Sequence, residues 1–296
     1  MNRPSSDVLR SRLTVEQKRR IAYTRMRFRR PLAGLRGTPS FMVIGAQRSG
    51  TSSLYRYLAA HPEGRPSVRK ETEYFTRSYG EGPTWYRSHF TLRRSGCSFE
   101  ATPDYLFHPL APARVATDLP TCRLVVLLRE PAARARSHWQ HMTRIGFEQL
   151  SFADALDAES ERIDTDLARL EAGAPVVEGP LLRYSYRARG FYAEQLERWQ
   201  VLFPPEQLLV LRSEDLFADP AATLARVEQF VGLPLWLPPS FANWSVPILE
   251  DDRGVDLGAH ERRVFDDLRA SYAAANARLA DLTGVADWWP AVVDGG

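Results

Sequence analysis

The chain has 296 residues, enough for one large domain or two small ones, and 44% of them are hydrophobic and 25% charged. No apolar run approaches the roughly 20 residues of a membrane-spanning helix, and the N-terminus lacks the apolar segment of a signal peptide. The only two cysteines, Cys97 and Cys122, have no metal-binding spacing, so neither a disulfide framework nor a zinc site is expected. These features favour a protein of the reducing cytoplasm.

The charge is unevenly distributed along the chain. Residues 1–37 contain eleven of the 39 basic and two of the 36 acidic residues, which gives this basic arm a net charge of +9. The other 28 basic and 34 acidic residues give residues 38–296 a net charge of −6, which argues against nucleic-acid binding. We expect residues 38–296 to form a single domain. The arm is either a solvated segment, packed on the domain or disordered, or an interfacial helix drawn to the anionic inner face of a membrane.

Residues Phe41–Leu58 form the segment around which the rest of the chain is organised. Phe41–Ile44 is a short apolar run typical of a buried strand, and Leu54 and Leu58 have the i, i+4 spacing of an amphipathic helix. Between them, Gly45–Ser53 combines two glycines, an arginine and several hydroxyl groups. The unpaired N–H groups and the positive dipole end of the helix would face this loop, which predicts an anion-binding cradle.

The loop differs from the P-loop spacing G-x-x-x-x-G-K-[ST] in one place. Gly45 and Gly50 have the right separation, but Thr51 follows directly without a lysine, and the cation lies inside the loop at Arg48. We therefore expect a loop that binds phosphate or sulfate but is not a standard ATP site.

The first helix is expected to end at His61-Pro62, and residues 62–73 form a polar connector too rich in proline and glycine for the core. A connector in this position can pass over the carboxyl ends of parallel strands, where ligands bind. Glu71 in this connector is therefore a candidate base, and the alternative is a solvated loop carboxylate.

A second anion site is predicted after the apolar run Arg123–Leu128, which follows a short strand at Cys97–Glu100 and a helix at Ala111–Asp118. In a P-loop NTPase such a strand would present an aspartate to Mg²⁺. Here it ends in Arg129, which repels a metal and attracts an anion, and Ser137 on the following helix could share that anion.

The remaining segments continue the alternation of strands and helices. They comprise a charged helical insertion over residues 151–180 that could cover the site, a helix reaching Phe203, a strand at Leu208–Leu211, a helix at Pro220–Val231 and a final helix at Ala259–Leu282. The alternation predicts an α/β fold with a central parallel sheet flanked by helices.

Several of these segments together resemble the sulfotransferases that use 3′-phosphoadenosine 5′-phosphosulfate (PAPS), particularly a bacterial branch similar to heparan sulfate and other carbohydrate sulfotransferases. The resemblance runs from Phe41 to Gly232 and is carried by GAQRSGTSSLYRYLAAHP, KETEYF, EATPDYLF, LVVLLREPAARARSHW, RGFYAEQLERW and LLVLRSEDLFADP. It implies a P-loop-NTPase-like sulfotransferase fold and PAPS as the sulfuryl donor, without a metal.

The resemblance also implies roles for individual residues. Glu71 is expected to be the catalytic base, while Arg48 and Lys70 stabilise charge on the leaving phosphate oxygen. Ala101 stands where many heparan-type enzymes have lysine, so an anionic glycan would lack that cation. The expected nucleotide-binding residues are Gln47, Arg48, Ser49, Gly50, Thr51, Ser52, Ser53, Arg129, Ser137, Arg189, Gly190, Arg253 and Gly254.

The sequence does not identify the acceptor of the sulfuryl group. We expect Glu73, Asp104 and Tyr105 to line its pocket, and Glu73, His89 and His108 are the alternative bases if Glu71 is dispensable. The acceptor would be a hydroxyl or amine of a carbohydrate, glycolipid or metabolite, with a protein tyrosine also open. The alternative functions are a P-loop nucleotide kinase or ATPase and a catalytically inactive nucleotide-binding module.

Overall fold

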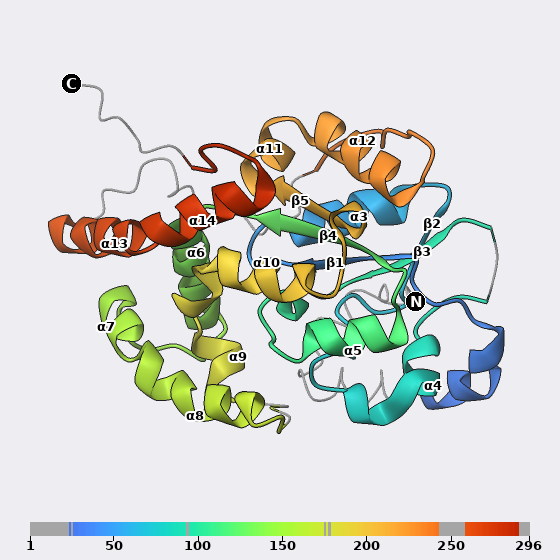
Figure 1. Cartoon of the computed structure of the whole chain (residues 1–296), viewed down its shortest axis with the longest axis horizontal. Helices are drawn as coiled ribbons and strands as arrows, with labels where there is room; N and C mark the ends of the chain where they lie inside the picture. Colours follow the sequence, from blue (N-terminus) through green and yellow to red (C-terminus); the bar gives the residue numbers. More distant parts are fainter. Residues whose placement is uncertain are drawn as a thin grey trace, which may run out of the picture.

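A five-stranded parallel sheet forms the centre of the computed structural model, in the order β2-β3-β1-β4-β5 (Figure 1). The structure describes residues 24, 26–92, 95–174, 176, 179–242 and 258–289. The strands are β1 (Phe41–Gly45), β2 (Gly64–Pro66), β3 (Cys97–Ala101), β4 (Arg123–Leu128) and β5 (Leu208–Arg212). Strands β2 and β3 lie on one side of β1, and β4 and β5 on the other. The connections that follow the neighbouring strands β1 and β4 therefore lead toward opposite edges of the sheet, and the strand order reverses between these two strands. Ligands of open α/β sheets bind at such a reversal.

Helices cover both faces of this sheet (Figure 1). The α-helices are α3 (Thr51–Ala60), α4 (Gly82–Arg87), α5 (Ala111–Asp118), α6 (Pro131–Arg144), α7 (Phe152–Asp157), α8 (Glu159–Glu171), α9 (Pro180–Tyr184), α10 (Tyr192–Gln200), α11 (Ser213–Ala218), α12 (Pro220–Val231), α13 (Ala259–Ser271) and α14 (Ala273–Thr283). Short 3₁₀ helices are η1 (Arg30–Leu35), η2 (Tyr79–Glu81), η3 (Pro103–Tyr105), η4 (Ala188–Gly190) and η5 (Pro205–Gln207).

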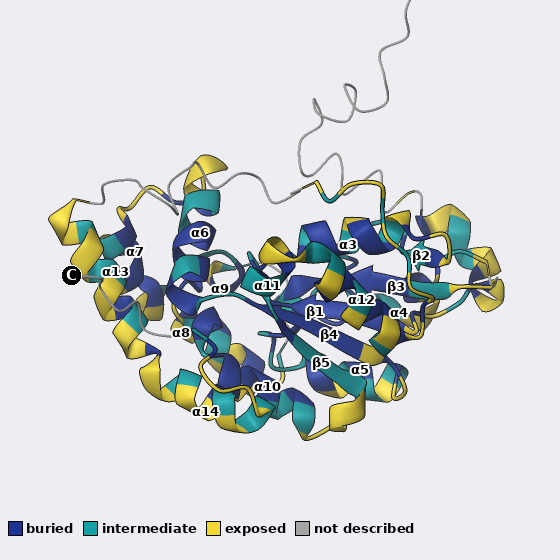
Figure 2. Ribbon diagram, turned by 90° about the horizontal axis from the view of Figure 1, so that it is seen from above, coloured by how far each residue is buried: buried dark blue, intermediate teal, exposed yellow. Residues whose placement is uncertain are grey.

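The two faces of the sheet belong to two hydrophobic cores because successive side chains of a strand point to opposite faces. In β1, Phe41 and Val43 pack with α3, α11 and α12, whereas Met42 and Ile44 pack with α4, α5 and α10. Figure 2 shows β1 and β4 as buried between these layers. Trp199 of α10 is fully buried in the second core. Burial on both faces explains why β1 and β4 are nearly continuous apolar runs in the sequence.

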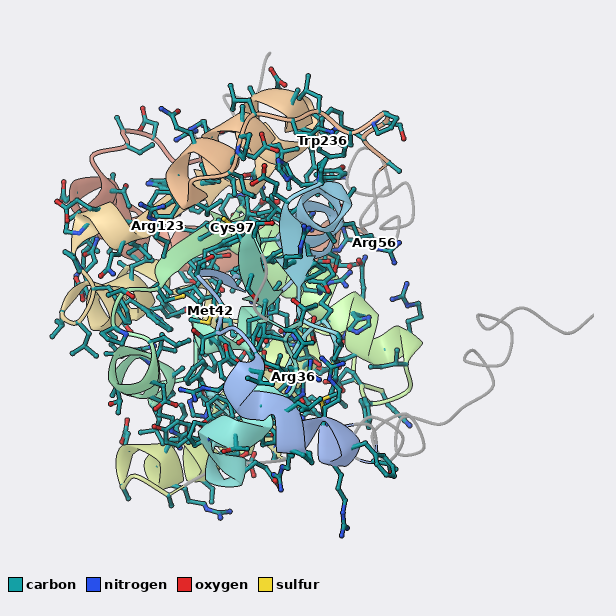
Figure 3. The ribbon with its side chains drawn as sticks, turned by 90° about the vertical axis from the view of Figure 1, so that its right-hand side faces the viewer. Arg36, Met42, Arg56, Cys97, Arg123 and Trp236 are labelled. Carbon is teal, nitrogen blue, oxygen red and sulfur yellow. The ribbon has the colours of Figure 1, made fainter. Side chains whose placement is uncertain are left out.

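The strands begin at the side of the molecule opposite the predicted site. Cys97 and Arg123 are the first residues of β3 and β4, and Figure 3 looks onto the side where they lie. The predicted site residues Arg48 and Arg129 instead follow the carboxyl ends of β1 and β4.

The predicted elements over Arg123–Leu128, Ala111–Asp118 and Pro220–Val231 are confirmed with these bounds. Two expectations were wrong. The connector 62–73 contains strand β2, which tolerates Pro66 because it lies at the edge of the sheet. The expected final helix is two helices that meet at Tyr272, a fully buried residue whose hydroxyl donates to the carbonyl of Arg187.

The described part of the basic arm packs on the domain. Met26 is buried in the same core as α4, and the guanidinium groups of Arg29 and Arg36 donate to the carbonyl of Phe90. The hypothesis of a packed arm is therefore confirmed for this part, and the rest of the arm lies outside the described residues. None of the helices that the structure describes is both long and apolar enough to span a bilayer.

Candidate functional site

The loop between β1 and α3 lies at the carboxyl end of the central strand. Gly45 must be glycine here, since a Cβ at this position would lie 2.5 Å from the Cβ of Leu106. Gly50 has a φ of 84° and directly precedes α3, a conformation that glycine adopts without strain. At the start of α3, the N–H groups of Ser53 and Leu54 donate to the carbonyl of Gly50. Those of Thr51 and Ser52 have no acceptor within the helix, so they are available to an anion in this loop.

The two predicted anion sites adjoin each other. The side chain of Arg48, in the loop after β1, donates from Nε to the hydroxyl of Ser137 on α6 over 3.1 Å. These residues are 89 positions apart in the sequence, yet the neighbouring strands β1 and β4 deliver them to the same edge of the sheet. The structure thus brings the loop and the α6 site together.

Positive charge is concentrated around Arg48. Burial, followed by the nearby Arg144, Arg129 and Arg134, lowers the pKa of the Arg48 guanidinium to about 10. The buried hydroxyl of Ser49 in the same loop has no hydrogen-bond partner within the described chain. A group of converging cations beside an unpaired donor suits a ligand with several negative oxygens.

A cationic residue follows β4, at the position where a nucleotide hydrolase would have an acidic residue. Arg129 follows Leu128, and its carbonyl accepts a hydrogen bond from Tyr192. The next residue, Glu130, accepts hydrogen bonds from the backbone N–H groups of Ala132 and Ala133 and so caps α6. Within the described residues, no group of three or more His, Cys, Asp and Glu side chains is arranged to hold a metal.

Lys70 links the connector after β2 to the loop. Its ammonium group donates to the hydroxyl of Ser52 over 3.0 Å and to the carboxylate of Glu71 over 2.8 Å. The side chain of Glu71 is 45% exposed, and its backbone N–H bonds the carbonyl of Ala101 at the end of β3. Glu71 is therefore held beside the loop Gly45–Ser53 with its carboxylate partly exposed.

Glu73 and Asp104 belong to a network of ion pairs. Glu73 lies 3.5 Å from Arg69 and 3.6 Å from Arg77, and burial raises the pKa of its carboxyl in spite of these cations. Asp104 pairs with Arg77 at 3.8 Å and with the buried Arg189 at 2.8 Å. Both carboxylates are thus paired with arginines within the protein, and both are less exposed than Glu71, which is paired with Lys70.

Arg189 and Gly190 lie in η4, inside the domain. Arg189 is 2% exposed and stacks on the ring of Phe107 in addition to pairing with Asp104. A Cβ at Gly190 would lie 2.5 Å from the ring of Tyr272, so close packing requires glycine there. Contact of this pair with a nucleotide stays a prediction. Arg253 and Gly254 lie outside the described residues.

Tyr105 and the two alternative histidine bases are buried. The hydroxyl of the fully buried Tyr105 contacts Thr72 and Glu100. Burial lowers the pKa of both His89 and His108 to about 4, and their exposed fractions are 1% and 3%. Each of these three side chains would reach an acceptor only if the structure around it opened.

Two residues on α6 that lie near Arg48 were not predicted from the sequence to belong to the site. His141 and Arg144 follow Ser137 at i+4 and i+7, a spacing that places all three on one face of the helix and that could have revealed them. Arg144 donates to Nδ1 of His141 over 3.0 Å. Burial, with Arg48 and Arg144 nearby, lowers the pKa of His141 to about 4, so its imidazole is neutral at pH 7.

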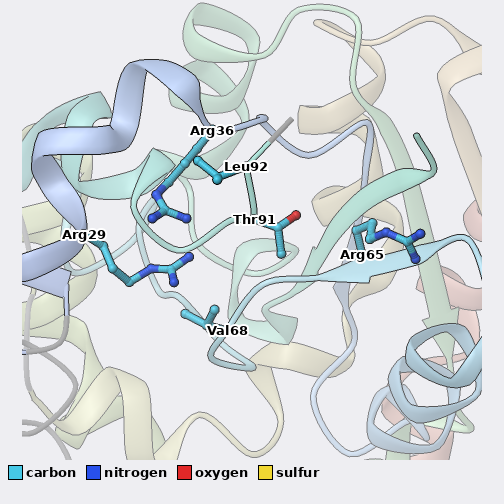
Figure 4. Close-up of a pocket in the computed structure, with 6 residues that line it drawn as sticks. All are labelled: Arg29, Arg36, Arg65, Val68, Thr91 and Leu92. Atoms are coloured by element: carbon cyan, nitrogen blue, oxygen red, sulfur yellow. The ribbon is translucent and has the colours of Figure 1, made fainter. Parts of the chain in front are cut away.

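A separate pocket of about 410 Å³ lies beside the edge strand β2 (Figure 4). It is lined by Arg29, Arg36, Arg65, Val68, Thr91 and Leu92. None of the predicted site residues lines it. The guanidinium groups of Arg29 and Arg36 point toward its centre in Figure 4, while that of Arg65 points away.

Comparison with known proteins gives a consistent result. Residues 38–241 match the family model described as "Sulfotransferase domain". The chain is 32% identical over 207 residues to human heparan sulfate glucosamine 3-O-sulfotransferase 3B1, in a match covering 68% of this chain and 48% of that protein. It is 31% identical over 207 residues to human bifunctional heparan sulfate N-deacetylase/N-sulfotransferase 3, covering 66% and 22%, respectively.

A solved structure is also similar along most of its length. The crystal structure of a sulfotransferase from Alicyclobacillus acidocaldarius matches with a TM-score of 0.68 and 26% identity, covering 85% of this chain and 99% of that one. By contrast, the chain spans half or less of the length of the two human relatives.

Proposed function

The chain belongs to the sulfotransferase family, and from this premise we propose that it transfers a sulfuryl group from PAPS to a hydroxyl or amine of a carbohydrate, glycolipid or metabolite. The observation that carries the proposal is the hydrogen bond between Arg48 and Ser137, which holds two predicted anion sites next to each other. A donor with a 5′-phosphosulfate and a 3′-phosphate has two anionic ends, and so requires two such sites.

The residues fit this donor. Gln47–Ser53, with the N-terminus of α3, would hold the 5′-phosphosulfate, and Arg129 and Ser137 would hold the 3′-phosphate. PAPS, when bound, supplies the sulfuryl group and leaves as 3′-phosphoadenosine 5′-phosphate (PAP). In the ligand-free protein burial, followed by the converging cations, lowers the pKa of Arg48, and an anion of this charge would relieve the repulsion between the cations.

The acceptor would be activated by Glu71. Its exposed carboxylate accepts the proton of the acceptor hydroxyl or amine, as that group forms its bond to sulfur and the bond from sulfur to the phosphate oxygen breaks. Arg48 and Lys70 stabilise the negative charge that develops on the departing oxygen. Lys70 suits this role because it bridges Ser52 of the loop and Glu71. Removing one such electrostatic donor typically costs about 2.7–4 kcal/mol of transition-state stabilisation.

A carbohydrate acceptor is supported by the human relatives, whose names state that they act on heparan sulfate. Glu73 and Asp104 would border the acceptor, but both are already paired with arginines. Ala101, in place of the lysine expected in heparan-type enzymes, removes one cation from this region. A neutral sugar or an amine is therefore the acceptor that these groups suit best.

Replacing Glu71 tests the base. Glu71→Gln should retain PAP affinity within about twofold but lose turnover by roughly 10²–10⁴-fold, the usual contribution of a general base. Turnover is measured as PAP release from PAPS with a panel of neutral, amine-bearing and sulfated saccharides. Glu63→Gln, an exposed carboxylate on the same connector, is the matched control and should behave as the unmodified protein. Full activity of Glu71→Gln would rule out Glu71 as the base.

Calorimetry tests the donor. PAP should bind equally well with and without EDTA, whereas ATP, which lacks the 3′-phosphate, should bind at least tenfold more weakly. Tight ATP binding that depends on Mg²⁺ would instead favour a nucleotide kinase or ATPase. Absence of PAP formation with every acceptor, despite PAP binding, would favour an inactive nucleotide-binding module.

Membrane contact is a separate part of the proposal. The basic arm, residues 1–37, has a net charge of +9 and would be attracted to the anionic inner face of a membrane. Co-sedimentation with vesicles containing phosphatidylserine, with and without residues 1–23, measures this attraction. Equal binding of the two forms would refute membrane contact through residues 1–23.

A further inference from the structure

A fully buried carboxyl group, that of Glu100, lies next to the residue that follows the proposed base Glu71. Glu100, on β3, has no exposed surface. Its Oε2 accepts hydrogen bonds from the hydroxyls of Thr72 at 2.6 Å and Thr102 at 2.9 Å, and its Oε1 accepts one from Tyr86 at 2.5 Å. The hydroxyl of Tyr105 lies 3.3 Å from Oε1.

Burying the Glu100 carboxyl in this way lowers the free energy of unfolding, so stability by itself gives no reason for a carboxyl here. None of the described arginines, lysines or histidines forms an ion pair with Glu100, so only hydroxyl dipoles compensate for removing the carboxyl from water. An apolar side chain of similar size would avoid that cost, as it often does when it replaces a buried charge. A carboxyl group, however, offers two oxygens as acceptors, so it can hold several hydroxyl donors at one point.

The hydroxyl groups that bond Glu100 hold residues 71–73 in an uncommon backbone conformation. Glu71 and Glu73 have φ values of 62° and 56°, in the left-handed region that residues other than glycine seldom adopt. Such conformations persist only where surrounding contacts hold them, and they are concentrated at functional sites. Thr72, the residue between them, is fully buried and anchored to Glu100.

The following residues are held by the same group of hydroxyls. Tyr105 accepts hydrogen bonds from the backbone N–H groups of Tyr74 at 3.0 Å and Phe75 at 3.4 Å. On the other side of Thr72, the N–H of Glu71 bonds the carbonyl of Ala101, the residue after Glu100. Thr72 therefore points into the protein while Glu71, next to it, remains 45% exposed.

We propose that Glu100 is a positioning residue for sulfuryl transfer, which acts through Thr72 to hold the Glu71 carboxylate in its outward orientation. The proposal rests on the proposed function, in which Glu71 is the base. Because a displacement of about 1 Å at a reacting group can cost on the order of 100-fold in rate, a backbone held in this way would matter for turnover.

A matched pair of substitutions at Thr72 tests this. Thr72→Val is nearly isosteric but removes the hydroxyl that bonds Glu100, whereas Thr72→Ser keeps it. We expect Thr72→Val to lower kcat by about 10- to 100-fold, with KM for PAPS and PAP affinity changed less than about twofold. Thr72→Ser should keep kcat within about threefold. Glu100→Gln, which turns one acceptor oxygen into a donor, should resemble Thr72→Val.

Combining these changes with Glu71→Gln separates positioning from a purely structural role. If Thr72 acts through Glu71, Thr72→Val should change the residual kcat of Glu71→Gln by less than about twofold. The proposal would be overturned by an unchanged kcat in correctly folded Thr72→Val, or by an equal loss of kcat in both backgrounds. If Thr72→Val does not fold, Glu100→Gln is judged by the same two criteria.

The same experiment distinguishes failure of this proposal from failure of the proposed function. An active Glu71→Gln enzyme refutes the base, whatever Thr72→Val does. An inactive Glu71→Gln enzyme together with a fully active Thr72→Val enzyme refutes only the positioning role of Glu100.

Discussion

The ligand-free protein should become more stable when the charge of Arg48 is removed. Arg48 is surrounded by Arg129, Arg134 and Arg144, and burial together with these cations lowers its pKa from the ordinary 12.5 to about 10. At about 1.36 kcal/mol per pKa unit, this difference corresponds to at most about 3.4 kcal/mol of cost for the charged form. Partial exposure of Arg48 reduces that figure through solvent screening.

Arg48→Met would also lose the hydrogen bond to Ser137, which contributes about 1 kcal/mol. We therefore expect a net gain of about 1 kcal/mol in the free energy of unfolding without ligand. With PAP at 100 times its Kd, the unmodified protein should gain about 2.7 kcal/mol. The variant should gain much less because Arg48 would hold the phosphate. The order of stability would thus reverse on adding PAP.

Urea unfolding followed by circular dichroism, with and without PAP, measures both effects. Arg226→Met, at an exposed position on α12, controls for the loss of an arginine as such and should leave both free energies within about 0.5 kcal/mol. A ligand-free Arg48→Met protein that is less stable than the unmodified one would refute the reasoning. It would mean that the cations are compensated within the protein and do not await an anion.

Two further predictions concern buried ionisable groups. Asp104→Asn removes the closest counter-charge of the buried Arg189 and should lower the free energy of unfolding by about 3–5 kcal/mol; a loss below about 1 kcal/mol in urea unfolding would contradict this. Burial lowers the pKa of His89 from 6.5 to about 4, so in that pH range the unfolded chain binds more protons and stability falls as the pH falls. Between pH 7 and pH 5 the protonation of His89 should cost about 2 kcal/mol, and His89→Leu should lose this part of the pH dependence while keeping that of His108 and His141; the same pH dependence in both proteins would argue against it.

Much of the fold could be read from the sequence because its information is local. A buried parallel strand is a continuous apolar run, so Arg123–Leu128 was recognised with its observed bounds. Strand β2 was missed because three residues with a proline give no such pattern, and only pairing with β3 makes Gly64–Pro66 a strand. Likewise, the helix break at Tyr272 depends on a contact with Arg187, 85 positions away.

For the candidate site, too, some features could be predicted from the sequence and others depended on the tertiary structure. The sequence by itself predicted an anion loop at Gly45–Ser53, because its glycines, its cation and the helix start are consecutive residues. It also determined that β4 ends in a cation and not in a metal ligand.

Only the tertiary structure decided that Arg48 bonds Ser137, that Lys70 bridges Ser52 and Glu71, and that Glu100 anchors Thr72. These contacts join residues that different strands carry to one edge of the sheet. Their geometry depends on strand order and packing, which no local pattern of residues contains.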